Sequence, residues 1–264
     1  MSATNSSAYV ALDDQRFQSS ELTRGPWDPG HQHAGPPIAL AGREIGRAAA
    51  ALGMTHLARL TANLLRPVPI APLRVEVATE YAGRNVAHFS ARIYGEEREV
   101  ARFTAVAQRE HEIELPAHAL PQTPVPPDGL EPIVFPHRAG VVGYHDLVEL
   151  RVAEGTLTRG PCAVWFRLRH PLLAGEAPGA IERVAVAADS GNGISAELDF
   201  KRYIFVNSDL TINLLRPARG EWICIDARTL LGPAGGGIAE ARIFDAQGLI
   251  GRSTQSLHVR ARQA

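Results

Sequence analysis

The sequence predicts an α+β protein made of two copies of one small fold, each with a helix packed on an antiparallel β-sheet. Three observations lead to this prediction. The segment LTANLLRP at 60–67 returns as LTINLLRP at 210–217. In each half a helical pattern precedes a run of closely spaced strand patterns, and such short connections allow only antiparallel neighbours. The length of 264 residues suits two domains of ordinary size.

The repeat continues beyond these two octets. Seven of their eight positions are identical, and the exception places Ala62 against Ile212. The same offset of 150 residues then aligns Thr104 with Thr254 without a gap. A register held for about 45 residues indicates a duplicated domain, and a repeat of this length is a whole fold rather than a solenoid unit.

The composition is that of a globular protein with a sizeable core, because 45% of the residues are hydrophobic and 21% are charged. A net charge of −1 gives no general attraction to nucleic acid or to an anionic membrane. No apolar run approaches the roughly 20 residues of a membrane helix, and we see no signal peptide. We therefore expect a cytoplasmic protein that binds neither nucleic acid nor membranes. Cys162 and Cys224 lie in apolar runs and are expected to be buried free thiols.

The first half is predicted to hold one helix and then a sheet. Pro36 and Pro37 precede an apolar-periodic run, and prolines suit the first turn of a helix. Apolar residues recur at three- and four-residue spacing up to Leu52, which predicts one buried face. Strands are expected near 57–66, 73–81, 85–94 and 98–108, separated by turn signals.

A proline-rich stretch separates this half from the second. We interpret residues 112–145 as a semi-extended linker, which gives an N-terminal domain at 1–111 and a C-terminal domain at 146–264. The second half is predicted to contain a helix from Pro178 onward. Its strands are expected near 147–157, 162–169, 204–215, 222–231, 237–245 and 249–260.

Three matched positions differ in kind between the two copies. Asp189, Asn207 and Gln255 are polar where the offset of 150 residues places an alanine, a leucine and an alanine in the first copy. An unpartnered buried amide costs on the order of 1–3 kcal/mol, and an unpaired buried carboxylate costs more. The simplest interpretation is that the three side chains meet in one polar pocket between helix and sheet. Taken singly, each also fits a satisfied cap, an edge position or a strand start.

These motifs resemble those of the tandem hot-dog acyl-CoA thioesterases of the thioesterase II type. The resemblance rests on Gly25-Pro26-Trp27, on Gln32-His33-Ala34-Gly35-Pro36-Pro37, on the paired Leu-Leu-Arg-Pro strands, on Ala188-Asp189 and on Ser253-Thr254-Gln255-Ser256-Leu257. It implies a double hot-dog fold, with a long helix wrapped by an antiparallel sheet in each repeat. One chain would then mimic a hot-dog dimer.

The resemblance also implies an active site of Asp, Thr and Gln that activates a water molecule. Asp189 and Gln255 match two of these residues, while the Thr position falls on Asn207, which lacks a hydroxyl group. Thr211 is a nearby alternative on the same side of the strand. We expect substrate contacts from Thr211, His33, Gly35 and Arg216, the last through the phosphates of CoA.

The expected chemistry is hydrolysis of a fatty acyl-CoA with Asp189 as general base and backbone N–H groups as oxyanion donors. A Gly-x-Ser-x-Gly elbow is absent from the sequence, which disfavours a covalent serine mechanism. His31 and His33 lack a third metal ligand, so we expect no metal and no cofactor.

Two alternatives stay open. The spacing of Asp28 and His33 loosely resembles that of hot-dog enoyl-CoA hydratases, and Asn207 is also compatible with a non-catalytic acyl-CoA-binding protein. The assembly is expected to be a monomer of two fused hot-dogs or a homo-oligomer.

Overall fold

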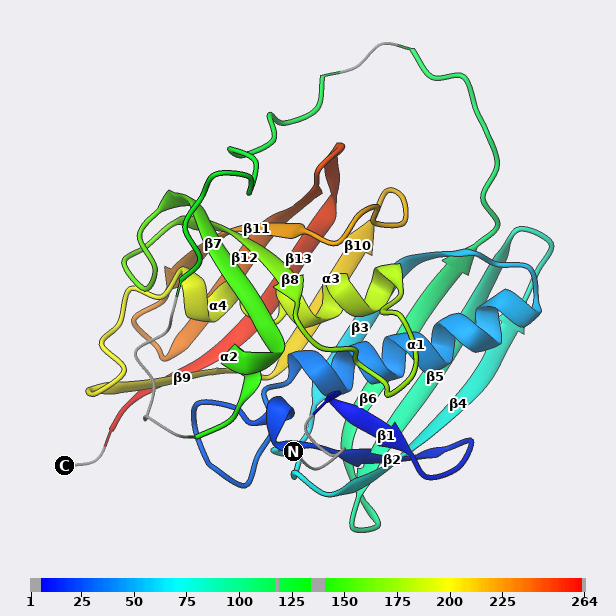
Figure 1. Cartoon of the computed structure of the whole chain (residues 1–264), viewed down its shortest axis with the longest axis horizontal. Coiled ribbons are helices and arrows are strands. Elements are labelled where there is room, and N and C mark those ends of the chain that lie inside the picture. Colours follow the sequence, from blue (N-terminus) through cyan, green and yellow to red (C-terminus); the bar gives the residue numbers. More distant parts are fainter. Residues whose placement is uncertain (1–5, 117–118, 134–140, 263–264) are drawn as a thin grey trace.

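A computed structural model describes residues 6–116, 119–133 and 141–262, and over these residues thirteen strands form one sheet (Figure 1). The first half contributes six strands: β1 (Tyr9–Ala11), β2 (Arg16–Ser19), β3 (His56–Leu64), β4 (Pro72–Ala82), β5 (Val86–Gly95) and β6 (Arg98–Gln108). The second half contributes seven: β7 (Val148–Gly155), β8 (Cys162–Leu168), β9 (Tyr203–Asn207), β10 (Asp209–Leu214), β11 (Ile223–Leu231), β12 (Gly236–Asp245) and β13 (Gly248–Ala261).

The strand order is β1-β2-β4-β5-β6-β3-β10-β13-β12-β11-β8-β7, with β9 paired to β13 beside this path. All the strand pairs named here are antiparallel, as predicted. The order is symmetric about the pair β3–β10, where Thr61 lies opposite its own counterpart Thr211. A pseudo-two-fold axis therefore passes through this residue pair and relates the two halves.

The duplication extends to irregularities of the sheet. The β5–β6 pair shifts register between Ile93 and Tyr94, and the β12–β13 pair shifts between Ile243 and Phe244, which is the same place in the repeat. A bulge in one strand bends it and re-aims the side chains beside it. Matching bulges mean that the two halves share their sheet curvature as well as their strand order.

The helices lie together on one face of the sheet (Figure 1). They are α1 (Gly35–Ala51), α2 (Tyr144–Leu147), α3 (Ala180–Ala188) and α4 (Gly191–Ile194), with a short 3-10 turn at η2 (Glu21–Thr23). Helix α1 has proline in its first turn and buries Ile38, Ala41 and Ile45, as its periodicity predicts. Leu52, expected on the same buried stripe, caps the helix and is exposed.

The second half departs from the expectation of a long helix in each repeat. Helix α3 has nine residues, begins at Ala180 rather than Pro178, and ends with Asp189 as its C-cap, whereas α1 has 17 residues. The sequence Ser-Gly-Asn-Gly follows Asp189 and contains residues of low helix propensity. The chain therefore turns after Asp189 and restarts as the short helix α4.

Helices α1 and α3 pack closely because glycines of α1 face α3. A Cβ on Gly35 would lie 2.8 Å from the carbonyl oxygen of Val186, and one on Gly42 would lie 3.1 Å from the side chain of Ile181. These contacts bring the N-terminus of α1, from the first half, against α3 of the second half. The α1–α3 contact is thus a second interface between the two halves. The first is the pairing of β3 with β10, which we call the β3–β10 seam.

The later part of the segment expected to be a linker packs against the second half, whereas residues 112–116 are exposed. Val125 accepts a hydrogen bond from the Trp165 indole at 2.7 Å, and the Ile133 amide donates to Leu150 at 2.8 Å. Trp165 belongs to a small apolar cluster that Leu130 helps to cover. The domain boundaries themselves stay a prediction. Cys162 and Cys224 are buried free thiols, as expected.

In the described part of the chain, we find no helix that is both long and apolar enough to span a membrane.

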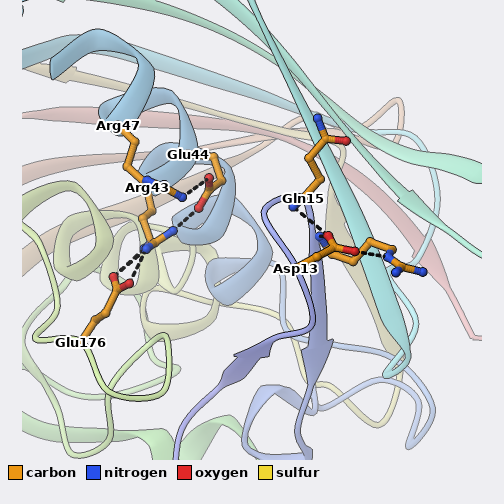
Figure 2. A network of polar contacts seen from close by, with 7 residues as sticks. Asp13, Gln15, Arg43, Glu44, Arg47 and Glu176 are labelled. Carbon is orange, nitrogen blue, oxygen red and sulfur yellow. Dashed lines mark hydrogen bonds and ion pairs between the residues drawn. The ribbon is translucent and has the colours of Figure 1, made fainter. Parts of the chain in front are cut away.

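A charged network fastens α1 to the loop before α3 (Figure 2). The Arg43 guanidinium binds Glu176 with an Nη2–Oε1 distance of 2.6 Å and also contacts Glu44. Arg47 reaches the other oxygen of Glu44 at 3.2 Å. The Arg43 side chain is only 9% exposed, whereas that of Arg47 is 58% exposed.

We predict that Arg43→Ala lowers the free energy of unfolding by about 1–3 kcal/mol, because it leaves the half-buried Glu44 carboxylate with one exposed partner. Arg47→Ala, on the same helix and with the same partner, should change the free energy of unfolding by no more than about 0.5 kcal/mol. Urea unfolding of both variants measures the difference. Equal losses would show that the network does not join the two halves.

Candidate functional site

The three polar residues that distinguish the second copy meet at one point. Asn207 Nδ2 donates a hydrogen bond to Asp189 Oδ1 at 2.8 Å. Gln255 Nε2 donates to the Asp189 backbone carbonyl at 3.2 Å and approaches Oδ1 at 3.4 Å. Asp189 is 7% exposed and Gln255 is 2% exposed. The three side chains therefore converge between helix and sheet, as expected.

A bulge in the sheet positions Asn207. Strand β9 pairs Asn207 with Leu257, and β10 pairs Thr211 with Thr254, so the pairing slips by one residue at Ser208 between them. The first copy has the same irregularity near Leu57 in β3. The side chains of Leu57 and Asn207 thus start from equivalent places in the two sheets. Only the second copy has an amide side chain at this place.

Asp189 occupies an unfavourable position for a carboxylate. It caps the C-terminus of α3, where the last backbone carbonyls gather partial negative charge. Burial adds a desolvation cost. Hydrogen-bond donors from Asn207 and Gln255 offset these costs. A carboxylate kept in such a place is more readily explained by chemistry than by stability.

A further partner comes from the first half. His33 Nδ1 lies 2.9 Å from Asp189 Oδ2, and the His33 side chain is 16% exposed. The Gly35 amide also points at Nδ1, at 3.2 Å. A ring nitrogen either donates or accepts, so when Nδ1 carries a proton for Asp189 the Gly35 N–H is free for another acceptor. The site therefore combines residues of both halves.

Tyr144 was not identified as a site residue from the sequence, because it lies at the end of the proline-rich stretch. Its ring stacks on that of His33 with centroids 3.8 Å apart and an interplanar angle of 6°. Its hydroxyl donates to the Val186 carbonyl at 2.7 Å and lies 2.9 Å from Ser190 Oγ. Burial raises the pKa of the Tyr144 phenol, so this group stays protonated and positions His33.

Asn192 is a second residue that the sequence did not indicate. Its backbone N–H donates to Gln255 Oε1 at 3.0 Å, in the short helix α4 that follows Asp189. This contact fixes the direction of the Gln255 amide, so that the NH₂ group faces Asp189. The interruption of the second helix thus supplies the donor that orients the Gln255 amide.

The Gly-Pro-Trp motif of the first half contacts residues that neighbour the site in the chain. Gly25 leaves no room for a side chain, since a Cβ there would lie 2.9 Å from the His33 backbone nitrogen. Trp27 packs on Phe200 and Phe205, each with a centroid distance of 5.8 Å. Phe205 lies on β9, two residues before Asn207.

Thr211 and Arg216, which are expected to contact the substrate, both bind other side chains of the protein. Thr211 is at the seam, where its hydroxyl donates to Thr61 at 3.2 Å. Arg216 Nη2 binds Asp245 at 2.7 Å. Asp245 is fully buried. Arg216 thus neutralises a buried carboxylate, and its expected contact with CoA phosphates stays a prediction.

The Asp28 and His33 pair that would resemble a hydratase is not formed. Asp28 lies 3.3 Å from His31, and His33 binds Asp189 instead. Among the residues that the structure describes, no group of three or more His, Cys, Asp or Glu side chains is arranged to hold a metal ion.

We predict that Gly35→Ala lowers the free energy of unfolding by about 1–3 kcal/mol, because the added methyl group meets the Val186 carbonyl of the packed helix. Gly46→Ala, in the same helix, has its nearest neighbour at 3.9 Å and should stabilise by about 0.5–1 kcal/mol. Denaturant unfolding distinguishes the two. Stabilisation by both would mean that the approach of α1 to α3 at Gly35 is looser than described.

Solved structures share this fold over nearly their whole length. A protein described as a thioesterase II from Thermobifida fusca superposes with a TM-score of 0.77 at 17% identity, covering 98% of both chains. A hot-dog protein of unknown function from Alicyclobacillus acidocaldarius gives 0.77 at 16% identity over 100% of both chains. An acyl-CoA thioesterase II from Mycobacterium marinum gives 0.69 at 18% identity, covering 97% of this chain and 96% of that one. These likenesses show a hot-dog fold.

Family models identify the sequence more closely. The acyl-CoA thioesterase N-terminal domain matches residues 23–108, and the C-terminal domain of the same family matches residues 121–259. The second match alone spans more than half of the chain. None of the curated protein sequences matches the chain significantly. With both domain models matched in order, the chain belongs to the tandem hot-dog, thioesterase II-like family of acyl-CoA thioesterases.

Proposed function

We propose that the protein hydrolyses fatty acyl-CoA thioesters, with Asp189 as the general base that activates a water molecule. The observation that carries this proposal is the buried Asp189 carboxylate, held by Asn207 at 2.8 Å and lying 2.9 Å from His33 at the N-terminus of α1. Thioester hydrolysis needs a base, groups that hold a water and donors for an oxyanion. Asp189 is suited to act as the base, the Asn207 amide to hold the water, and the Gly35 N–H to act as the donor.

The Asp189 carboxylate keeps one hydrogen-bond acceptor position for a water molecule. Its two oxygens offer about four lone-pair sites. Asn207 and Gln255 approach Oδ1, and His33 approaches Oδ2. One lone pair on Oδ2 is left for the nucleophile. Asn207 uses its NH₂ group toward Asp189, so its carbonyl oxygen can accept the second hydrogen of that water.

The N-terminus of α1 supplies the oxyanion donor. Its partial positive charge favours a negative oxygen, and Pro36 and Pro37 have no N–H to offer. The Gly35 N–H is therefore the donor of this first turn that can bind a thioester oxygen. It is available when His33 donates Nδ1–H to Asp189, so His33 and Gly35 act together.

The reaction follows from this arrangement. Asp189 takes a proton as the water oxygen attacks the thioester carbon, and the carbonyl oxygen becomes an oxyanion at the Gly35 N–H. The C–S bond then breaks, the carboxylic acid forms, and the proton passes from Asp189 to the CoA thiolate. Each bond formed is balanced by one broken, and the sequence of steps needs no metal or cofactor.

We predict that Asp189→Asn lowers kcat/KM for acyl-CoA by about 10²- to 10⁴-fold, the usual contribution of a general base. The change in kcat/KM is measured with a thiol reagent that detects free CoA, over a panel of acyl-CoA chain lengths. Asp28→Asn serves as the matched control and should retain full activity, because Asp28 pairs with His31 outside the site. Unchanged turnover in Asp189→Asn would refute the assigned base.

We predict that Asn207→Leu abolishes hydrolysis, because leucine is the residue that the first copy carries at this position and it cannot hold the carboxylate or the water. Asn207→Thr should preserve activity within about tenfold, since a hydroxyl group can donate to Asp189 and contact water. The kcat/KM values of the two variants are compared after both have been shown to be folded. Full activity of the leucine variant would exclude Asn207 from the site.

The same panel tests the alternatives. A 2-enoyl-CoA reports hydration through loss of its enoyl absorbance, and this outcome would assign the buried Asp–His pair to a hydratase. Tight binding of acyl-CoA without CoA release would assign a non-catalytic role. Size measurement in solution distinguishes a monomer from a homo-oligomer. The β3–β10 seam already joins both halves within one chain, so the proposed site needs no second copy.

A further inference from the structure

Arg24 connects the segment that leads to His33 with the segment that carries Tyr144. Its side chain is 17% exposed. Nη1 donates a hydrogen bond to the Val142 carbonyl at 2.6 Å, and Nε donates to the Pro29 carbonyl at 3.0 Å. A guanidinium group presents its N–H donors in a rigid planar fork, so one side chain can hold both carbonyls at fixed directions.

The backbone beside Arg24 holds the same two segments. The Tyr144 N–H donates to the Arg24 carbonyl at 3.0 Å, and the His33 N–H donates to the Thr23 carbonyl at 2.7 Å. Thr23 is fully buried. Helix α2, which begins at Tyr144, accordingly lies beside the N-terminal segment of the chain (Figure 1). Residues 23 and 24 thus bind the backbone of both stacked residues.

Tyr144 is held at both of its ends. Arg24 binds its backbone, and the Val186 carbonyl of α3 accepts a hydrogen bond from its hydroxyl at 2.7 Å. The His33 ring stacks on the Tyr144 ring at 3.8 Å and contacts Asp189 with its Nδ1 at 2.9 Å. Because the two rings are nearly parallel, a displaced Tyr144 would let the imidazole tilt away from the carboxylate.

We propose that Arg24 is a positioning residue of the active site, which fixes the His33 imidazole against Asp189 by holding Tyr144 in place. The inference rests on the proposed function for the roles of His33 and Asp189. Arg24 acts through the main chain and through the Tyr144 ring, so it is not a catalytic residue. A misplacement of about 1 Å in a reacting group can lower a rate by about 100-fold, so such a contact can control turnover.

The ion pair of Arg24 is the lesser of its contacts. Nη2 binds Glu21 at 2.9 Å, but the Glu21 side chain is 53% exposed. Exposed ion pairs contribute little, because water and salt screen them. The contacts with Val142 and Pro29 are the ones that reach the segments of the site. Removing Glu21 should therefore have a much smaller effect than removing Arg24.

The kinetic test uses the full chain. Arg24→Ala should lower kcat for acyl-CoA by about 10- to 100-fold and change KM by less than about twofold, because Arg24 holds a reacting group and not the substrate. Arg24→Lys should not restore kcat, since an ammonium group is a point charge without the planar fork. Glu21→Gln should keep kcat within about twofold. Arg16→Ala is the matched control, because Arg16 forms a similar but exposed pair with Asp13.

An NMR signal of the His33 ring gives a readout that does not depend on turnover. An imidazole stacked face to face on a phenol ring is shielded, so its Cε1–H resonance is shifted upfield. The signal is assigned as the one that His33→Gln removes. Tyr144→Leu gives its position without the stacked ring. Arg24→Ala should move the signal toward that position, whereas Glu21→Gln should leave it in place.

Gly143→Ala tests the same contact with Arg24 present, should Arg24→Ala fail to fold. Gly143 has an extended backbone with φ −167°, which alanine adopts, and the added methyl group would lie 3.2 Å from the Arg24 carbonyl oxygen. This close contact should displace Tyr144 and produce both changes to a smaller extent. Folding of each variant is checked by urea unfolding.

The outcomes separate this inference from the proposed function. A loss of kcat in folded Arg24→Ala with an unmoved His33 signal would overturn it, because Arg24 would then act by another route. A moved signal with unchanged kcat would equally overturn the positioning role. If the native chain releases no CoA, the proposed function fails, and the His33 signal in Arg24→Ala still decides whether Arg24 holds that ring.

Discussion

The pairing of β3 with β10 is the constraint on which the rest of the structure depends. Because Thr61 lies opposite Thr211, the two copies are related by an axis through the middle of one continuous sheet. The sheet then has no free edge at its centre, where single domains would need a partner chain. The same axis sets α1 beside α3 and so brings His33 of one half against Asp189 of the other.

Because the fold is duplicated, the two halves can differ at matched positions, and only the second half carries the three polar residues that converge between helix and sheet. A buried carboxylate at the C-terminus of a helix is destabilising unless donors surround it. In the second half, Asn207, Gln255 and the neighbouring His33 supply those donors. In the first half, the matched residues Leu57 and Ala105 are apolar, so these positions hold no group that could activate a water molecule.

The helix of the second half illustrates how local propensity serves the site. Ser-Gly-Asn-Gly follows Asp189 directly and ends α3, whereas the helix of the first copy, α1, continues to Ala51. The turn exposes the Asn192 amide to Gln255, whose NH₂ group then faces the carboxylate. The unusual shortness of this helix is thus part of the way the polar residues are held. A continuous helix would have used that amide for its own hydrogen bonds.

The sequence by itself determined the duplication, the antiparallel strands and the three polar positions, because an apolar-to-polar change at a matched core position needs no coordinates to be noticed. Only the tertiary structure decided which of the expected contacts are made. Tyr144 and His33 are 111 residues apart in the chain, and no local pattern records that their rings stack. Arg216 likewise occupies the same position of the repeated motif as Arg66, and only folding places the buried Asp245 beside it. Strand periodicity is a local property, whereas the pairing of charges and rings depends on which surfaces the axis brings together.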